Sequence, residues 1–258
     1  MLHHISSQPG VVLLMAITGS FGVLTWTGCK SEVVSGTLEL KLEETVGAED
    51  LTFDNLAYES GAGHTYSVIT LKYYLSRMQI RSKVGALLDL TDVIYRDARD
   101  PDSGARSVTD IPNGEYTSLE FIFGLDDAMN VDGGLENTLQ NINMEWPIPG
   151  DQGYHYMKYE GKYYVYHSDT IRSFNLHLGP TGGNQNFFHV TLPISSLAIN
   201  GDNWRITLIM DVNEWLQNPN TYDFEVHGPA IMMNQTAQEL LKENGETVFS
   251  VTSVQRIN

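Results

Sequence analysis

The stretch "MEWPIPGDQGYHYMKYEG", residues 144–161, places two Met, one Trp and one His among Tyr, Gly and Pro residues. Imidazole and thioether groups are donors that suit soft metal ions such as Cu(I) when no thiol is available. Because side chains on a strand repeat every two residues, His155 and Met157 are predicted to share a face, where they could bind one ion together, whereas Met157 taken alone is predicted to be a core residue. Met144 and Trp146 are further candidates, as ligand or wall of a metal site or else as core packing.

A second candidate ligand lies in "SFNLHLG", residues 173–179. Strand alternation puts Phe174, Leu176 and Leu178 on one face and turns His177 to the other, toward solvent or a ligand. Beyond the first 28 residues the chain keeps six His and seven Met, and its single Cys is Cys29. An exported copper site in this chain would therefore use imidazole and thioether donors.

The segment "DDAMNVDGG" contains Asp126, Asp127, Asn130 and Asp132 before two Gly residues. This resembles the start of a calcium loop, but Ala128 stands where the first ligand would be and no Glu closes the loop. A polar turn is the default interpretation.

Standard enzyme signatures are missing from the sequence. It contains no nucleophile elbow, P-loop, dinucleotide fingerprint, H-E-x-x-H motif or paired C-x-x-C. Paired carboxylates for glycoside cleavage remain open, because the distance between two acids is not readable in one dimension. We expect a protein that is not an enzyme.

The N-terminal residues are typical of an exported lipoprotein. The apolar run "GVVLLMAITGSFGVL" is short for a membrane span and leads into "TWTGCKS", small residues followed by Cys29. We predict an export signal over residues 1–28, lipidation of Cys29 and a tether over 29–36. The alternative is an ordinary signal with a free Cys29. The predicted lipoprotein signal places the protein in the periplasm or on the outer-membrane surface, with the lipid anchor as its only membrane attachment.

The formal net charge of −17 excludes one class of partner. Such an acidic surface repels phosphate backbones, so we expect no nucleic-acid binding. The 41% apolar and 18% charged composition is that of a globular protein.

The rest of the chain alternates apolar and polar residues in short runs broken by Gly, Asn, Asp and Pro, which predicts antiparallel strands. The clearest runs are residues 36–44, 67–82, 116–124, 154–166, 173–179, 187–194 and 203–212. In "NQTAQELLKENGE", Thr236 and Glu239 form a capping box, and Asn244-Gly245 predicts the end of a helix. We therefore predict an all-β fold over residues 37–258, an antiparallel β-sandwich with a short C-terminal helix.

Four segments together resemble one known family in order and spacing. They are "VITLKYYLSRMQI", "IPNGEYTSLEFIFGLDDAMN", "MEWPIPGDQGYHYMKYEG" and "FNLHLGP". This set resembles the MbnP-like family of exported copper-binding proteins, and the tail "ELLKENGETVFS" is similar to a lipoprotein branch of it. The resemblance covers roughly residues 37 to 215.

The resemblance implies an all-β copper-binding protein of the periplasm or cell surface that serves copper acquisition. In relatives the copper site uses His side chains and a Trp that a di-haem partner of the MauG type oxidises to kynurenine. Trp146 matches the Met-x-Trp position, His177 the His-Leu-Gly position, and His155 the additional His. With Met144 as a lining residue, this set is expected to hold Cu(I) in preference to Cu(II).

One alternative function belongs to another class. The Tyr-rich run "YMKYEGKYYVY" predicts an aromatic face on which a surface lipoprotein would bind a glycan or a partner protein. The two interpretations differ in whether the Tyr or the His side chains converge on one site.

Overall fold

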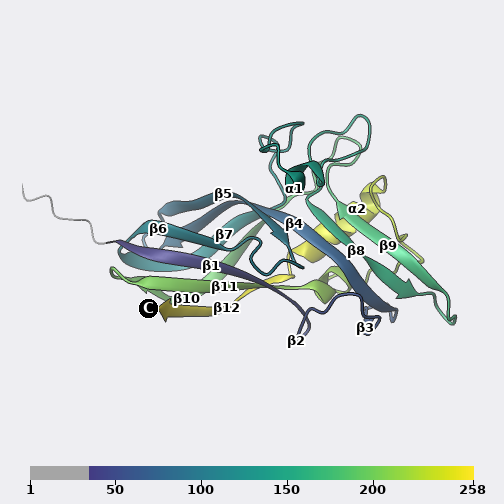
Figure 1. Cartoon of the computed structure of the whole chain (residues 1–258), viewed down its shortest axis with the longest axis horizontal. Helices are drawn as coiled ribbons and strands as arrows, with labels where there is room; N and C mark the ends of the chain where they lie inside the picture. The colour runs from purple at the N-terminus through teal and green to yellow at the C-terminus, as the bar shows by residue number, and fades with distance from the viewer. Residues whose placement is uncertain (1–34) are drawn as a thin grey trace, which may run out of the picture. The chain divides into compact units, whose positions relative to one another are not determined.

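The computed structural model describes residues 35–258 (Figure 1). The predicted export signal and Cys29 lie outside the described residues. Strand β1 runs over Ser35–Val46, so Ser35 and Gly36 belong to the first strand and not, as predicted, to the tether. Among the described residues, no helix is long and apolar enough to cross a membrane.

Residues 35–258 form a sandwich-like arrangement of two sheets, which confirms the predicted fold class. The smaller sheet has the order β12 (Phe249–Ile257), β11 (Asn203–Asp211), β1 and β2 (Glu49–Asp50), with β6 (Arg106–Pro112) also paired to β1. One pair departs from the antiparallel prediction, because β1 and β11 run parallel.

The larger sheet is built around β4, an 18-residue strand over Thr65–Ser82. Its order is β10 (Phe188–Ile199), β7 (Gly114–Phe123), β4, β8 (Met157–Tyr164) and β9 (Ile171–Leu178), with β3 (Tyr58–Glu59) and β5 (Leu87–Asp97) also paired to β4. The first half of β4 pairs with β8 and the second half with β7. The β8–β9 hairpin is therefore attached to the first half of β4.

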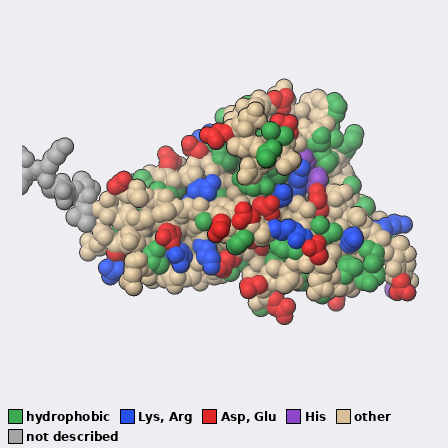
Figure 2. Space-filling model, in the orientation of Figure 1, with side chains coloured by type: hydrophobic (Ala, Val, Ile, Leu, Met, Phe, Trp, Pro, Cys, Tyr) green, Lys and Arg blue, Asp and Glu red, His purple; other side chains and the backbone are tan. Residues whose placement is uncertain are grey.

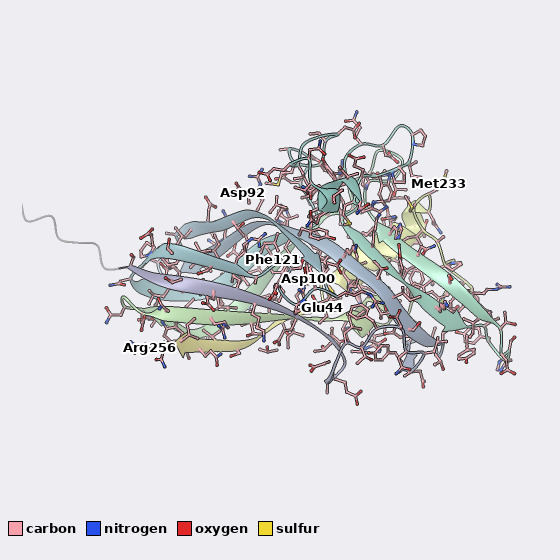
Figure 3. All side chains as sticks on the ribbon, in the orientation of Figure 1. Glu44, Asp92, Asp100, Phe121, Met233 and Arg256 are labelled. Carbon is pink, nitrogen blue, oxygen red and sulfur yellow. The ribbon has the colours of Figure 1, made fainter. Side chains whose placement is uncertain are left out.

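The core lies between the sheets because strand alternation sends every second side chain inward. Leu38, Leu40 and Leu42 of β1 meet side chains of the larger sheet such as Phe121, labelled in Figure 3. Burying each of these side chains contributes about 1.5–3 kcal/mol.

A buried ion pair also joins the two sheets. Arg96 on β5 donates to both carboxylate oxygens of Glu44 on β1, at 2.9 and 2.7 Å, and to the carbonyl of Asp100. Glu44 and Asp100 are labelled near the centre of Figure 3. The side chains of the pair are only 5% and 4% exposed, so neither charge is solvated if its partner is removed.

The predicted C-terminal helix is α2, over Gln235–Gly245. Its N-cap is Asn234, whose side chain accepts the Ala237 N–H at 3.2 Å, so the capping box predicted at Thr236 is wrong. Asn caps a helix as well as Thr does, and here it starts the helix two residues earlier. Strand β12 follows the helix and pairs with β11. The short helices α1 (Leu139–Ile142) and η1 (Val212–Leu216) complete the fold.

Candidate metal centre

Three aromatic rings from separate segments lie in a row beside the β8–β9 hairpin. The ring centroids of Trp146 and His155 are 4.7 Å apart, and those of His155 and His177 are 4.9 Å apart, each pair edge to face. Trp146 is 6% exposed, His155 is 2% exposed, and the His177 side chain is 13% exposed. The structure therefore brings together three of the four residues predicted as metal-site residues.

His177 lies on β9, and its neighbours Leu176 and Leu178 are buried on the opposite face, as predicted. Its Nε2–H donates to Glu160 Oε1 on β8 at 2.7 Å. Because a carboxylate accepts and does not donate, this bond selects the tautomer with the proton on Nε2. The buried Nδ1 then carries a lone pair, and it has no hydrogen-bond partner.

His155 has the complementary arrangement. Its Nδ1–H donates to the carbonyl oxygen of Met144 at 2.9 Å, and its backbone N–H donates to the same oxygen at 2.6 Å. The proton on Nδ1 leaves a lone pair on Nε2, which is buried and also lacks a partner. Two imidazoles in contact thus each keep one buried acceptor nitrogen unsatisfied.

The electrostatics keep His155 neutral. Burial, with smaller contributions from the Lys158 ammonium and the nearby His177, lowers the pKa of His155 from 6.5 to about 3. Lys158 stands opposite His177 in the β8–β9 ladder and donates to the Asn143 carbonyl. The hydrogen bond from His177 holds the pKa of Glu160 below its usual value.

The segment that carries His155 is held by the loop after β7. Asn130 Oδ1 accepts from the Tyr154 N–H and Asp132 Oδ1 from the Gly153 N–H, both at 2.8 Å. The carboxylate of Asp126 accepts N–H groups of its own turn. These contacts favour the polar-turn interpretation over a calcium loop, because the oxygens are used to hold backbone.

The helix α2 supports the other side of the centre. Gln238, fully buried, donates from Nε2 to the His177 carbonyl at 2.7 Å and accepts the Gly179 N–H at 3.1 Å. A Cβ on Gly179 would lie 2.4 Å from the Trp146 ring, so glycine lets the indole reach the sheet. Sequence reasoning identified neither Glu160 nor Gln238, since register and helix docking bring them to His177.

The family profile of MbnP matches residues 35–234. This chain belongs to the MbnP family. The solved structure of MbnP from Methylosinus trichosporium has a similar fold, with a TM-score of 0.55 and 15% sequence identity over 87% of this chain and 99% of that chain. No curated protein sequence matches this chain.

In this MbnP-family protein Met144 and Met157 are both core residues, which is one of the two positions that the sequence allows for each of them. Met157 is in the main core, while His155 contacts His177 on the other face of β8, so the predicted His155–Met157 pair is wrong. Regular strand structure begins only at Met157, and alternation does not extend back to His155. The Met144 side chain packs in a small aromatic cluster with Tyr74, and its backbone oxygen serves His155.

Most of the Tyr-rich run is buried. Tyr156, Tyr159 and Tyr163 are each at most 1% exposed, whereas Tyr164 and Tyr166 at its end are half-buried. The β8 strand lies between β4 and β9 in the sheet, so its inward side chains enter the core instead of meeting a glycan or a partner. Of the two sets of side chains, the His residues converge on one site.

Proposed function

We propose that this MbnP-family protein binds copper without being an enzyme, and that His155 and His177 supply the ligands. The observation that supports the proposal is the pair of unpartnered buried nitrogens, Nε2 of His155 and Nδ1 of His177. Buried polar atoms normally have a partner, and a cation bound between two imidazoles whose ring centroids are 4.9 Å apart would satisfy both nitrogens. Each imidazole is already oriented by an acceptor behind it, as metal-binding histidines are.

The same geometry favours Cu(I) over Cu(II). The two nitrogen donors are buried imidazole nitrogens, and within residues 35–258 no group of three or more His, Cys, Asp or Glu is placed to hold a metal. Cu(II) takes a tetragonal set of N and O ligands, whereas Cu(I) accepts fewer and softer partners. Trp146 supplies an apolar wall that keeps water from the ion.

Trp146 is also the residue that a di-haem oxidase of the MauG type would convert to kynurenine. The buried indole Nε1 has no partner, and the ring touches His155, so a change in the indole would reach the ligand directly. Mass spectrometry of the peptide that contains Trp146, after purification from the native host, tests this step. An unmodified indole in copper-loaded protein contradicts it.

We place the protein outside the cytoplasm, in the periplasm or on the outer-membrane surface, anchored through a lipid on Cys29 and engaged in copper acquisition. The sequence pattern before Ser35 and the membership of the MbnP family support this placement. Membrane fractionation of cells that express the wild type or Cys29→Ser tests the anchor. Equal membrane association of both proteins would contradict it.

The direct test of copper binding is a Cu(I) titration against a colorimetric chelator. We expect one tight site in the wild type, and affinity at least about tenfold weaker in His177→Ala and in His155→Ala. His189→Ala is the matched control because His189 is exposed on β10 and contacts neither imidazole. Unchanged affinity in folded His155→Ala and His177→Ala would refute the assignment.

A further inference from the structure

The end of the domain at which the chain enters β1 is formed by three turns. Ser35 pairs with Pro112 at the β6–β7 turn, Gly114 pairs with Ile199 before the β10–β11 turn, and Ser82 pairs with Tyr116 beside the β4–β5 turn. These ladders bring the three turns together beside the first residue of β1. Figure 1 shows this end on the left, with β8 and β9 toward the right.

The β4–β5 turn presents apolar side chains to solvent. Val84 is 92% exposed and Leu87 is 46% exposed. Both line a cleft of about 520 Å³ together with Ala86, Leu88, Pro112 and Tyr116. Exposure of several aliphatic side chains to water at the tip of a hairpin is unfavourable. Such a patch indicates a surface that a membrane or another molecule covers.

We propose that this apolar tip, Val84 and Leu87 with the cleft beside them, inserts into the headgroup region of a phospholipid bilayer. The inference rests on the proposed lipid anchor at Cys29. Five residues lie between Cys29 and Ser35, and the six steps of chain that join them span at most about 20 Å. An anchored domain is therefore held with this end close to the bilayer.

The charges of the tip agree with a neutral lipid surface. Lys83 is paired with Glu115 at 2.6 Å, and Arg256, labelled in Figure 3 near the same end, is paired with Asp202. On the face in Figure 2 the acidic side chains gather toward the middle of the domain, and few lie at this end. On this face, a zwitterionic surface would meet little of the net negative charge.

Insertion of the tip would orient the candidate metal centre. His177 pairs with Lys158, which pairs with Lys72 near the middle of β4, whereas the apolar tip follows Ser82, the last residue of that strand. At about 3.3 Å per residue, the metal centre therefore lies roughly 30 Å along β4 from the tip. A domain seated on its tip presents the centre to the aqueous phase.

The test uses the single thiol of the chain. Protein that begins at Cys29 is coupled through it to phosphatidylcholine vesicles that carry a maleimide lipid, and backbone hydrogen exchange is compared with that of uncoupled protein. We expect the backbone exchange of residues 83–87 to slow by about tenfold. Partial burial of two aliphatic side chains in the bilayer stabilises the turn by enough to account for a change of this size. The segment around Val226, which is 73% exposed, should exchange at an unchanged rate.

A double variant, Val84→Asp with Leu87→Asp, is expected to lose this protection while Val226→Asp keeps it. Urea unfolding of each variant shows whether the fold is retained. No slowing at residues 83–87, or equal slowing in the double variant, overturns the proposal. Slowing that appears in solution at high protein concentration without vesicles also overturns it, in favour of contact between copies.

The chemical coupling separates this proposal from the proposed natural anchor. If coupled protein shows protection but the native chain carries no lipid on Cys29 by mass spectrometry, the anchor fails, and with it the membrane contact in the cell. If the lipid is present and residues 83–87 are not protected, only the tip insertion fails.

Discussion

Replacing Glu160 tests how the centre is organised, because of the two proposed ligands this carboxylate contacts only His177, at the ring nitrogen that is not proposed to bind copper. In the structure it accepts the His177 Nε2–H at 2.7 Å and thereby leaves Nδ1 free. A charge-assisted hydrogen bond contributes about 1.5–3 kcal/mol. The Glu160 side chain is 31% exposed, so solvent screening favours the lower figure of about 1.5 kcal/mol.

That energy corresponds to roughly a tenfold loss of Cu(I) affinity in Glu160→Ala. Glu160→Gln keeps a neutral acceptor and is expected to lose about half the energy, roughly threefold in affinity. The assay is the Cu(I) competition titration against a colorimetric chelator under reducing, oxygen-free conditions. Urea unfolding of the copper-free variants checks that the fold is retained.

The matched control is Glu120→Ala, which removes a carboxylate paired with Arg81 on β4, away from both imidazoles. Wild-type affinity in Glu160→Ala, combined with weak binding in His177→Ala, would refute the role of the carboxylate. Wild-type Cu(I) affinity in both Glu160→Ala and His177→Ala would show that His177 is not a ligand.

Three further predictions concern the copper-free domain. The folded pKa of His155, about 3, lies below its unfolded value of 6.5, so the unfolded state binds more protons between these values and stability falls with falling pH. We expect the free energy of unfolding, measured with urea, to fall by about 3 kcal/mol between about pH 7 and pH 4 because of this titration. This fall should be absent in His155→Gln. Gly179→Ala should push the Trp146 ring aside and cost about 1–3 kcal/mol, with an altered near-ultraviolet circular dichroism spectrum. Arg96→Ala should cost about 3–5 kcal/mol because it leaves the Glu44 charge buried, measured by the same unfolding.

Each of these has a matched control in the chain. An Ala in place of Gly114, where a Cβ would meet no atom within 4 Å, should leave Trp146 in position. Arg99→Ala removes an exposed ion pair with Asp54, a hydrogen bond to the Ile69 carbonyl and a contact with the Phe53 ring, and should cost only about 1–2 kcal/mol because no charge is left buried. Equal destabilisation by Arg96→Ala and Arg99→Ala would contradict the argument from burial. A slope with pH in His155→Gln equal to that of the wild type would contradict the titration of His155.

Local patterns in the sequence determined much of the fold. Period-two alternation predicted seven strands, among them β4 and β9, because one face of each must be buried and the sequence records that face. The same alternation placed His177 opposite Leu176 and Leu178, and the structure agrees. Asn244-Gly245 predicted the end of α2. Strands β5, β6 and β12 were not predicted, although each is paired in a sheet of the structure.

The candidate centre itself was decided by tertiary structure. His155 and Trp146 meet where two irregular segments of backbone lie together, and Asn130 from a third segment holds the one that carries His155. Neither residue is in a regular strand, so period-two alternation could not predict which way their side chains point. Glu160 reaches His177 through the register of the β8–β9 pair, and Gln238 through the docking of α2. A single sequence encodes residue types and local periods, whereas register and docking depend on contacts between distant segments. The residue types in the sequence therefore indicated copper chemistry, and the folded chain determined which imidazoles lie side by side and which of their nitrogens lack a partner.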